Sequence, residues 1–275
     1  MKNKFVSKKT VLILACIAIA LLLVLLYLLL APMFRGPEIP DSPLTSTTDL
    51  TETTEPPVTD NPVSTTEPVV ADPQMLPHMA EIYAKNPDVV GWVKIDGTML
   101  DYPVMHTPED PEKYIHLNFE ERYSYGGLPF MEDDCCMDPE SDNLIIYGHN
   151  MNDGSMFTTL MYYRDKQYWE KHPQVRFSTL YEDRTYDVIA VFYDQVYYNY
   201  EDVFKFYEFI DAEDEESFNE AMAYYKEKAI YDTGVTAEYG DRLLTLVTCA
   251  YHHQYGRFVL VARQSMDQPD EVTAP

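Results

Sequence analysis

The chain has 275 residues, and 46 acidic residues against 20 basic ones give it a formal net charge of −26 at pH 7. A surface this acidic repels a phosphate backbone, which argues against nucleic acid as a partner. Four cysteines without paired spacing argue against a domain held by disulfides, so the core has to be stabilised by packing.

The first apolar run predicts a membrane anchor over residues 11–32. Residues 11–31 hold no charged residue, and about 20 apolar residues suffice for a helix to span a bilayer. Lysines precede the run within residues 1–10, and only Arg35 follows it closely. The positive-inside rule therefore places residues 1–10 in the cytoplasm and everything after the anchor outside the cell. A lipoprotein cysteine at Cys16 is the weaker alternative, since cleavage there leaves too short an apolar stretch before it.

Composition divides the rest of the chain. Residues 33–73 are rich in Pro, Thr and acid, and they cannot bury enough apolar surface to fold, so we expect a disordered stalk. Residues 74–264 are expected to form the folded domain, and residues 265–275 a polar tail. We expect a single-pass protein of the cell membrane, with lipid around the anchor and the folded domain extracellular.

The folded domain is predicted to be mainly β. A helix is expected over residues 75–85, where Asn86 and Pro87 end it. Short runs of strand-forming residues follow, separated by turn signals. The predicted strands are residues 89–95, 98–106, 143–149, 186–193, 243–250 and 257–263. Short strands with irregular connections favour a barrel or sandwich over a parallel α/β sheet.

One long amphipathic helix interrupts the strands, over residues 211–231. Asp211 and Asp214 stand at the spacing of a capping box, and residues 232–234 supply a stop signal. Apolar side chains recur at spacings of four, three and four, as one helix face requires. These side chains are Phe218, Met222, Tyr225 and Ala229. We expect the helix to pack on the β core before the strand that ends at Cys249.

The pair Cys249 and Arg257 suggests a reactive site. Cys249 ends a predicted strand, Arg257 opens the next one, and a hairpin between them places the two residues opposite each other. Directly opposed Cβ atoms are about 5 Å apart. His149 follows another apolar strand, at an end where a scaffold can position it. Together the three residue types suit thiol acyl transfer: Cys attacks a carbonyl, His moves protons and Arg holds the developing oxyanion.

The motifs that carry these residues resemble those of the sortases. TLVTC at residues 245–249 resembles the cysteine signature, and NLIIYGHN at residues 143–150 resembles the histidine motif. The anchor and the two predicted helices are similar to those of class B members. The resemblance implies an eight-stranded β-barrel cysteine transpeptidase on the outer face of a Gram-positive membrane. Such enzymes cut a secreted protein at a C-terminal sorting motif and pass its thioacyl form to a cell-wall amine.

The resemblance also assigns roles. It makes Cys249 the nucleophile, His149 the general acid and base, and Arg257 the electrophilic clamp, with no cofactor. Tyr147 matches a tyrosine of the substrate groove, and we predict that Val247 and Thr248 of the TLVTC motif contact substrate as well. The partners implied are secreted proteins with a sorting motif and the amine of a peptidoglycan precursor or cross-bridge. One departure is Ala250, where class B members often carry an acid, which affects the motif preference and not the chemistry.

Structural roles without catalysis, or other site assignments, could also explain these residues. A buried inert thiol is the simplest alternative for Cys249, and Arg263 is the nearest rival for the clamp. Zinc is disfavoured because His252 and His253 point to opposite faces of an extended strand and no Cys-x-x-Cys is present, so we expect no metal. Cys135 and Cys136 are adjacent, which allows a vicinal disulfide, a redox pair or no role; the acids around them lack the spacing of an EF-hand loop.

Two other functions remain open from the sequence. A cysteine peptidase would use the same Cys and His but transfer the acyl group to water. A non-enzymatic module that binds the cell wall on a stalk would not depend on Cys249 at all.

Overall fold

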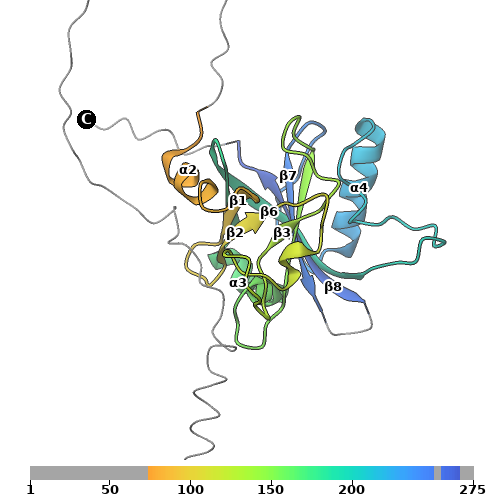
Figure 1. Ribbon diagram of the computed structural model, residues 1–275. Helices are drawn as coiled ribbons and strands as arrows, with labels where there is room; N and C mark the ends of the chain where they lie inside the picture. The colour runs from red at the N-terminus through yellow and green to blue at the C-terminus, as the bar shows by residue number, and fades with distance from the viewer. Residues whose placement is uncertain (1–73, 251–254, 267–275) are drawn as a thin grey trace, which may run out of the picture.

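The computed structural model describes residues 74–250 and 255–266. Eight strands close into a barrel in the order β1-β2-β3-β4-β7-β8-β6-β5. The strands are β1 (Val89–Lys94), β2 (Asp101–Met105), β3 (Phe130–Met131), β4 (Asn143–Gly148), β5 (Gln174–Thr179), β6 (Asp183–Gln195), β7 (Leu243–Cys249) and β8 (Gly256–Gln264). The prediction of a mainly β, eight-stranded barrel is confirmed (Figure 1).

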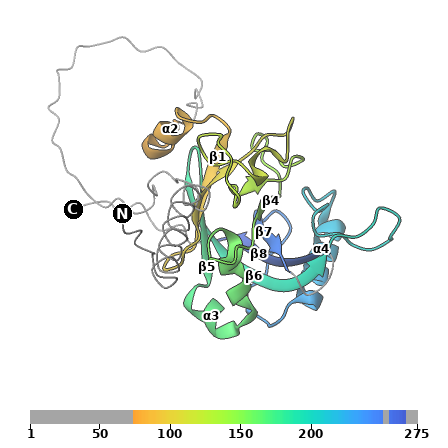
Figure 2. The same cartoon turned by 60° about the horizontal axis from the view of Figure 1, so that its bottom comes forward.

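Three α-helices and two 3₁₀ segments accompany the barrel in the described part of the chain. The helices are α2 (Pro77–Tyr83), α3 (Lys166–Lys171) and α4 (Glu215–Lys228), and the 3₁₀ segments are η2 (Lys113–Ile115) and η3 (Phe157–Arg164). α2 and α4 lie on opposite sides of the barrel (Figure 1, Figure 2). Within the described ranges no helix is both long and apolar enough to cross a membrane. The predicted anchor, stalk and most of the polar tail lie outside the described residues.

Two apolar clusters stabilise the domain. The larger one fills the barrel and continues under α4, where the rings of Phe192 in β6 and Tyr225 in α4 are 5.7 Å apart. The smaller one lies beneath α2 and includes Met79 and Trp92, both fully buried. All but the last residue of β7 are buried, so both faces of this central strand are covered. β-Branched and leucine side chains suit such a doubly buried strand, which is why its sequence does not alternate.

The long helix begins later than predicted. Its N-cap is Asp214, whose side chain accepts from the backbone N–H of Ser217 at 2.9 Å, while Ser217 Oγ accepts from Asp214 N at 3.1 Å. The capping box therefore pairs Asp214 with Ser217, and the prediction that it begins at Asp211 is wrong. The Asp211 carboxylate instead accepts from the backbone N–H of Asp142 at 2.9 Å. Phe218 and Tyr225 are buried as the helix face requires.

The strand predictions need three corrections. β6 spans Asp183–Gln195 rather than residues 186–193. β2 begins at Asp101 rather than at residue 98, because Thr98 forms a turn: its hydroxyl donates to Ile95 O at 2.8 Å and accepts from Leu100 N at 3.1 Å. The short strands β3 and β5 were not predicted. β3 has only two residues, and β5 contains a polar mixture that lacks the apolar run of its neighbours.

Candidate active site

Two adjacent parallel strands bring His149 and Cys249 together. β4 pairs with β7 in a register that opposes Tyr147 to Val247 and Gly148 to Thr248, so the next residue of each strand lies at the same barrel edge. Thr248 Oγ1 donates to Gly148 O at 2.7 Å, which fixes this register at the strand ends. Two sequence motifs about 100 residues apart therefore bring the backbones of His149 and Cys249, which follow these paired residues, to neighbouring positions at one barrel edge.

A side-chain bond also links the loops beyond these ends. Asn150 Nδ2 donates to the backbone carbonyl of Cys249 at 3.0 Å, and His149 O accepts from Phe157 N at 2.9 Å. Gly148 is required here because a Cβ at this position would lie 2.5 Å from Cγ of Phe157. The close approach of that buried ring holds the strand end that carries His149.

The predicted hairpin between the strands of Cys249 and Arg257 is present. β7 and β8 pair antiparallel with Cys249 opposite Arg257. The guanidinium Nη1 donates to the carbonyls of Gly256 at 3.1 Å and Tyr255 at 3.4 Å. No carboxylate of the described residues forms an ion pair with it, so its charge is available to an incoming carbonyl. The Cys249 thiol is free and partly exposed, so it is not the buried thiol of the simplest alternative.

The hydrogen bond of His149 defines its tautomer. Nε2 lies 3.1 Å from the carbonyl oxygen of Ile115. A carbonyl oxygen only accepts, so Nε2 carries the hydrogen and neutral His149 keeps the lone pair of Nδ1 for proton transfer. Burial lowers the pKa of His149; the bond to Ile115 opposes that effect, and the charge of His116 adds to it. These effects favour the neutral imidazole, which is the form that can act as a base.

Tyr147 is held by a carboxyl group that sequence reasoning did not identify. Its hydroxyl donates to Glu132 Oε2 at 2.6 Å, and its ring centroid lies 5.7 Å from that of Phe130 in β3. Burial, with Asp133 nearby, raises the pKa of Glu132 to about 7. The only available signal was the acidic run at residues 132–134, whose spacing gave no reason to single out one carboxyl.

The other two predicted substrate contacts are buried. Val247 has 0% and Thr248 2% of its surface exposed. These side chains offer almost no surface to a substrate, and their contact with substrate stays a prediction. Tyr147 is only partly buried, and it lies opposite Val247, on the sheet face shared by Cys249.

The rival residues have other structural surroundings. Arg263 lies opposite Leu243, at the far end of the hairpin, and its guanidinium nitrogens are 3.7 Å from Asp187 and 3.9 Å from Asp241. Cys135 and Cys136 are both free thiols, which excludes the vicinal disulfide.

Burial raises the pKa of the Cys135 thiol to about 12, so this thiol is inert at neutral pH. His252 and His253 lie outside the described residues. Within the described part of the chain, no group of three or more His, Cys, Asp or Glu side chains is arranged to hold a metal ion.

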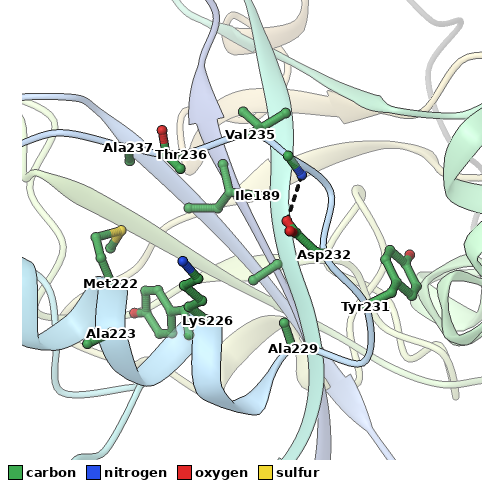
Figure 3. A pocket seen from close by; sticks show the side chains of 13 residues that line it. Ile189, Met222, Ala223, Lys226, Ala229, Tyr231, Asp232, Val235, Thr236 and Ala237 are labelled. Carbon is green, nitrogen blue, oxygen red and sulfur yellow. Dashed lines mark hydrogen bonds between the residues drawn. The ribbon is translucent and has the colours of Figure 1, made fainter.

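A separate cavity of about 560 Å³ lies between α4 and β6. Figure 3 shows Met222 and Lys226 of α4 on one side and Ile189 of β6 on the other. None of the predicted site residues lines it.

Comparison with known proteins identifies the family. A family model described as the sortase domain matches residues 93–265. The chain belongs to the sortase family. Sortase B of Staphylococcus aureus is 29% identical over 189 residues, which cover 68% of this chain and 74% of that protein. Sortase B of Listeria monocytogenes is 31% identical over 186 residues, which cover 66% of this chain and 72% of that protein.

Solved sortase B structures share the fold. The Staphylococcus aureus sortase B–substrate complex superposes with a TM-score of 0.62 at 28% identity, covering 70% of this chain and 86% of that one. Sortase B of Bacillus anthracis in complex with AAEK2 superposes with a TM-score of 0.63 at 27% identity, covering 72% and 86%. The class B resemblance is confirmed, and the protein is an enzyme of the sortase type, a cysteine transpeptidase.

Proposed function

We propose that this sortase cleaves the C-terminal sorting motif of secreted proteins through a thioacyl-enzyme on Cys249 and transfers them to a cell-wall amine. The observation that carries the proposal is the pairing of β7 with β4 on one side and with β8 on the other, which brings three residues to one edge of the barrel. The β4–β7 pairing sets His149 beside Cys249, and the β7–β8 pairing sets Arg257 opposite it. These positions support the assignment of Cys249 as nucleophile, His149 as base and Arg257 as the cation that binds the carbonyl oxygen.

The acylation step follows from these positions. Sγ of Cys249 attacks the carbonyl carbon of the scissile peptide bond, and Nδ1 of His149 takes the thiol proton. Arg257 neutralises the charge that develops on the carbonyl oxygen. The C–N bond then breaks, His149 returns the proton to the departing amine, and the acyl group remains on Cys249 as a thioester.

Deacylation reverses the proton path. The acceptor amine attacks the thioester carbon, and neutral His149 removes a proton from the attacking nitrogen. The C–S bond breaks, Cys249 recovers its proton from His149, and a new amide bond joins the two partners. Arg257 stabilises the oxyanion in this second step as in the first. Attack by water in place of the amine would give hydrolysis.

Relatives support the two substrate classes. Sortase B of Staphylococcus aureus has been solved as a substrate complex, and a sortase B has been solved in complex with triglycine. A glycine tripeptide ends in a free amine, the group that the deacylation step requires. By analogy we propose a peptide sorting motif as acyl donor and a short peptide amine of the peptidoglycan precursor or cross-bridge as acceptor.

The cellular arrangement is proposed from the sequence. Residues 11–32 anchor the enzyme in the cell membrane, residues 1–10 face the cytoplasm, and the stalk at residues 33–73 carries the catalytic domain outside. Secreted substrates and cell-wall amines meet the enzyme on that side of the membrane.

A ligation assay tests the proposal. The full-length chain in detergent micelles is mixed with a library of sorting-motif peptides and triglycine, and product masses are measured. We expect a peptide cut within its motif and joined to triglycine, with complete loss in Cys249→Ala. The matched control is Cys136→Ala, which removes another exposed thiol and should leave ligation intact. Cleaved peptide without ligation, whatever the amine supplied, would indicate a peptidase instead.

A further inference from the structure

The ring of His116 lies almost parallel to that of His149. Their centroids are 5.6 Å apart and their planes differ by 12°. His116 is itself held: its Nδ1 lies 3.2 Å from the carbonyl oxygen of Tyr125, and the Tyr125 ring lies 6.4 Å away at 17°. The residue before it, Ile115, supplies the carbonyl that binds His149 Nε2. Two consecutive residues therefore contact the predicted base.

The segment that carries these contacts, residues 113–128, is fixed at its start. Tyr114 is fully buried; its hydroxyl donates to Asp88 and accepts from Asn86, both at 2.8 Å. Lys113 donates to the same Asp88 carboxylate at 2.6 Å. These bonds anchor the turn of chain from which Ile115 and His116 extend.

The end of the segment is fixed as well. Ser124 N donates to His116 O at 3.0 Å, and Leu128 N donates to Tyr114 O at 3.0 Å. Gly127 has a φ of +56°, and a Cβ there would lie 2.2 Å from the Ile115 carbonyl oxygen. The chain thus folds back tightly beneath that carbonyl, and only glycine fits. The segment forms a built support and not a loose loop.

We propose that His116 is a positioning residue for His149, whose ring it holds against Ile115 and whose protonated form it disfavours when it is itself charged. The proposal deepens the proposed function, because it assumes that His149 is the base. Stacking restricts rotation of the catalytic imidazole and keeps Nδ1 directed away from the 113–128 segment. Two positive imidazolium rings at this separation repel each other.

Two other residues that can carry charge lie at this edge of the barrel. Cys249 stands beside it at the end of β7, and Arg257 follows across the hairpin on β8. Around His116 lie the rings of Tyr123 and Tyr125. No carboxylate of the described residues forms a salt bridge with either imidazole. A charge on His116 therefore acts on His149 while neither ring is paired with a carboxylate of the described residues.

The test follows each histidine ring directly. The full-length chain with ¹³C-labelled histidine side chains is titrated by NMR in detergent micelles, and the seven signals are assigned by single substitutions. His116→Phe keeps a flat ring but cannot be charged, and His116→Ala removes both ring and charge. His78→Phe, which removes a histidine from α2, is the matched control.

We expect the titration midpoint of His149 to rise by about half a pH unit or more in His116→Phe, because the repulsion between two like charges at this separation is removed. The acid limb of the kcat/KM profile should move by the same amount, while KM stays nearly unchanged. His116→Ala should also lower kcat, because the ring support is lost. His78→Phe should change neither.

An unchanged His149 midpoint in His116→Phe would overturn the proposal whatever the activity. A raised midpoint in a protein that ligates no peptide would instead overturn the proposed function and leave the role of His116 intact.

Discussion

Cys249 and Arg257 are direct partners across the β7–β8 hairpin, so the thiol and the guanidinium project from one face of the sheet. Both strands continue into the buried core, and their pairing extends without a shift from Leu243 to Cys249. The spacing of the two groups is therefore set by the barrel and not by a loop.

This relationship predicts that Arg257 stabilises the negative charge that develops on the substrate carbonyl oxygen and contributes little to folding. Arg257→Ala should lower kcat about 10²- to 10³-fold, as removal of an oxyanion-stabilising donor does. Arg257→Lys should recover only part of the rate, because an ammonium lacks the guanidinium fork. Ligation kinetics and thermal unfolding of the same preparations measure both effects. An Arg257→Ala enzyme with near-normal kcat would remove the clamp from the mechanism.

Gly148 connects packing to catalysis. An added Cβ would lie 2.5 Å from Cγ of buried Phe157, so Gly148→Ala should cost about 1–3 kcal/mol in stability and displace His149. Gly126→Ala is the matched control, since its Cβ would meet its nearest neighbour, Met151 Cε, at 3.4 Å. Denaturant unfolding and kcat test the pair. If Phe157→Leu added to Gly148→Ala restored neither stability nor rate, the clash would not be the cause.

Glu132 predicts a pH dependence of stability. Its pKa is raised from 4.5 to about 7, chiefly by burial, so the folded protein holds this proton more tightly than the unfolded chain does. The stabilisation is fully present below pH 4.5 and is lost as the pH rises through 7. Between pH 4.5 and 7, the free energy of unfolding should decline less in Glu132→Gln than in the wild-type protein. Unfolding experiments at several pH values measure this difference. The control is Glu238→Gln, at an exposed carboxyl, which should follow the wild-type curve.

The proposed membrane orientation can be tested by labelling a single cysteine. Cys136 is exposed and free, so a membrane-impermeant maleimide added to intact cells should label it. Peptide mass mapping locates the label, and Cys136→Ser should abolish that site. A cysteine placed by Asn3→Cys should react only after the cells are opened. Labelling of residue 3 in intact cells, with Cys136 protected, would reverse the proposed orientation.

The sequence was sufficient for those parts of the site that strand periodicity and motif spacing determine. Cys249 and Arg257 could be paired because a short hairpin fixes its own register. His149 could be recognised by its motif, but its place beside Cys249 depends on a parallel pairing between strands about 100 residues apart. Local sequence patterns carry no information on that pairing.

His116 and Glu132 could not be predicted for a similar reason. Each lies in a segment without regular periodicity. Each contacts the site through its own side chain, and the residue that it contacts is far away in the sequence. The late start of α4 has a different cause: Asp211 and Asp214 both fit a cap by type. The backbone N–H of Asp142, far away in sequence, binds the first of them.

The acyl-enzyme itself is the most direct test of the account. The full-length chain is mixed with a cleavable sorting-motif peptide in the absence of any amine, quenched in acid within seconds, and digested for mass mapping. We predict an added mass equal to the N-terminal fragment of the peptide, located on Cys249 and released by hydroxylamine as a thioester is. Cleavage that proceeds in Cys249→Ala, or an adduct that maps to another residue, would contradict the account.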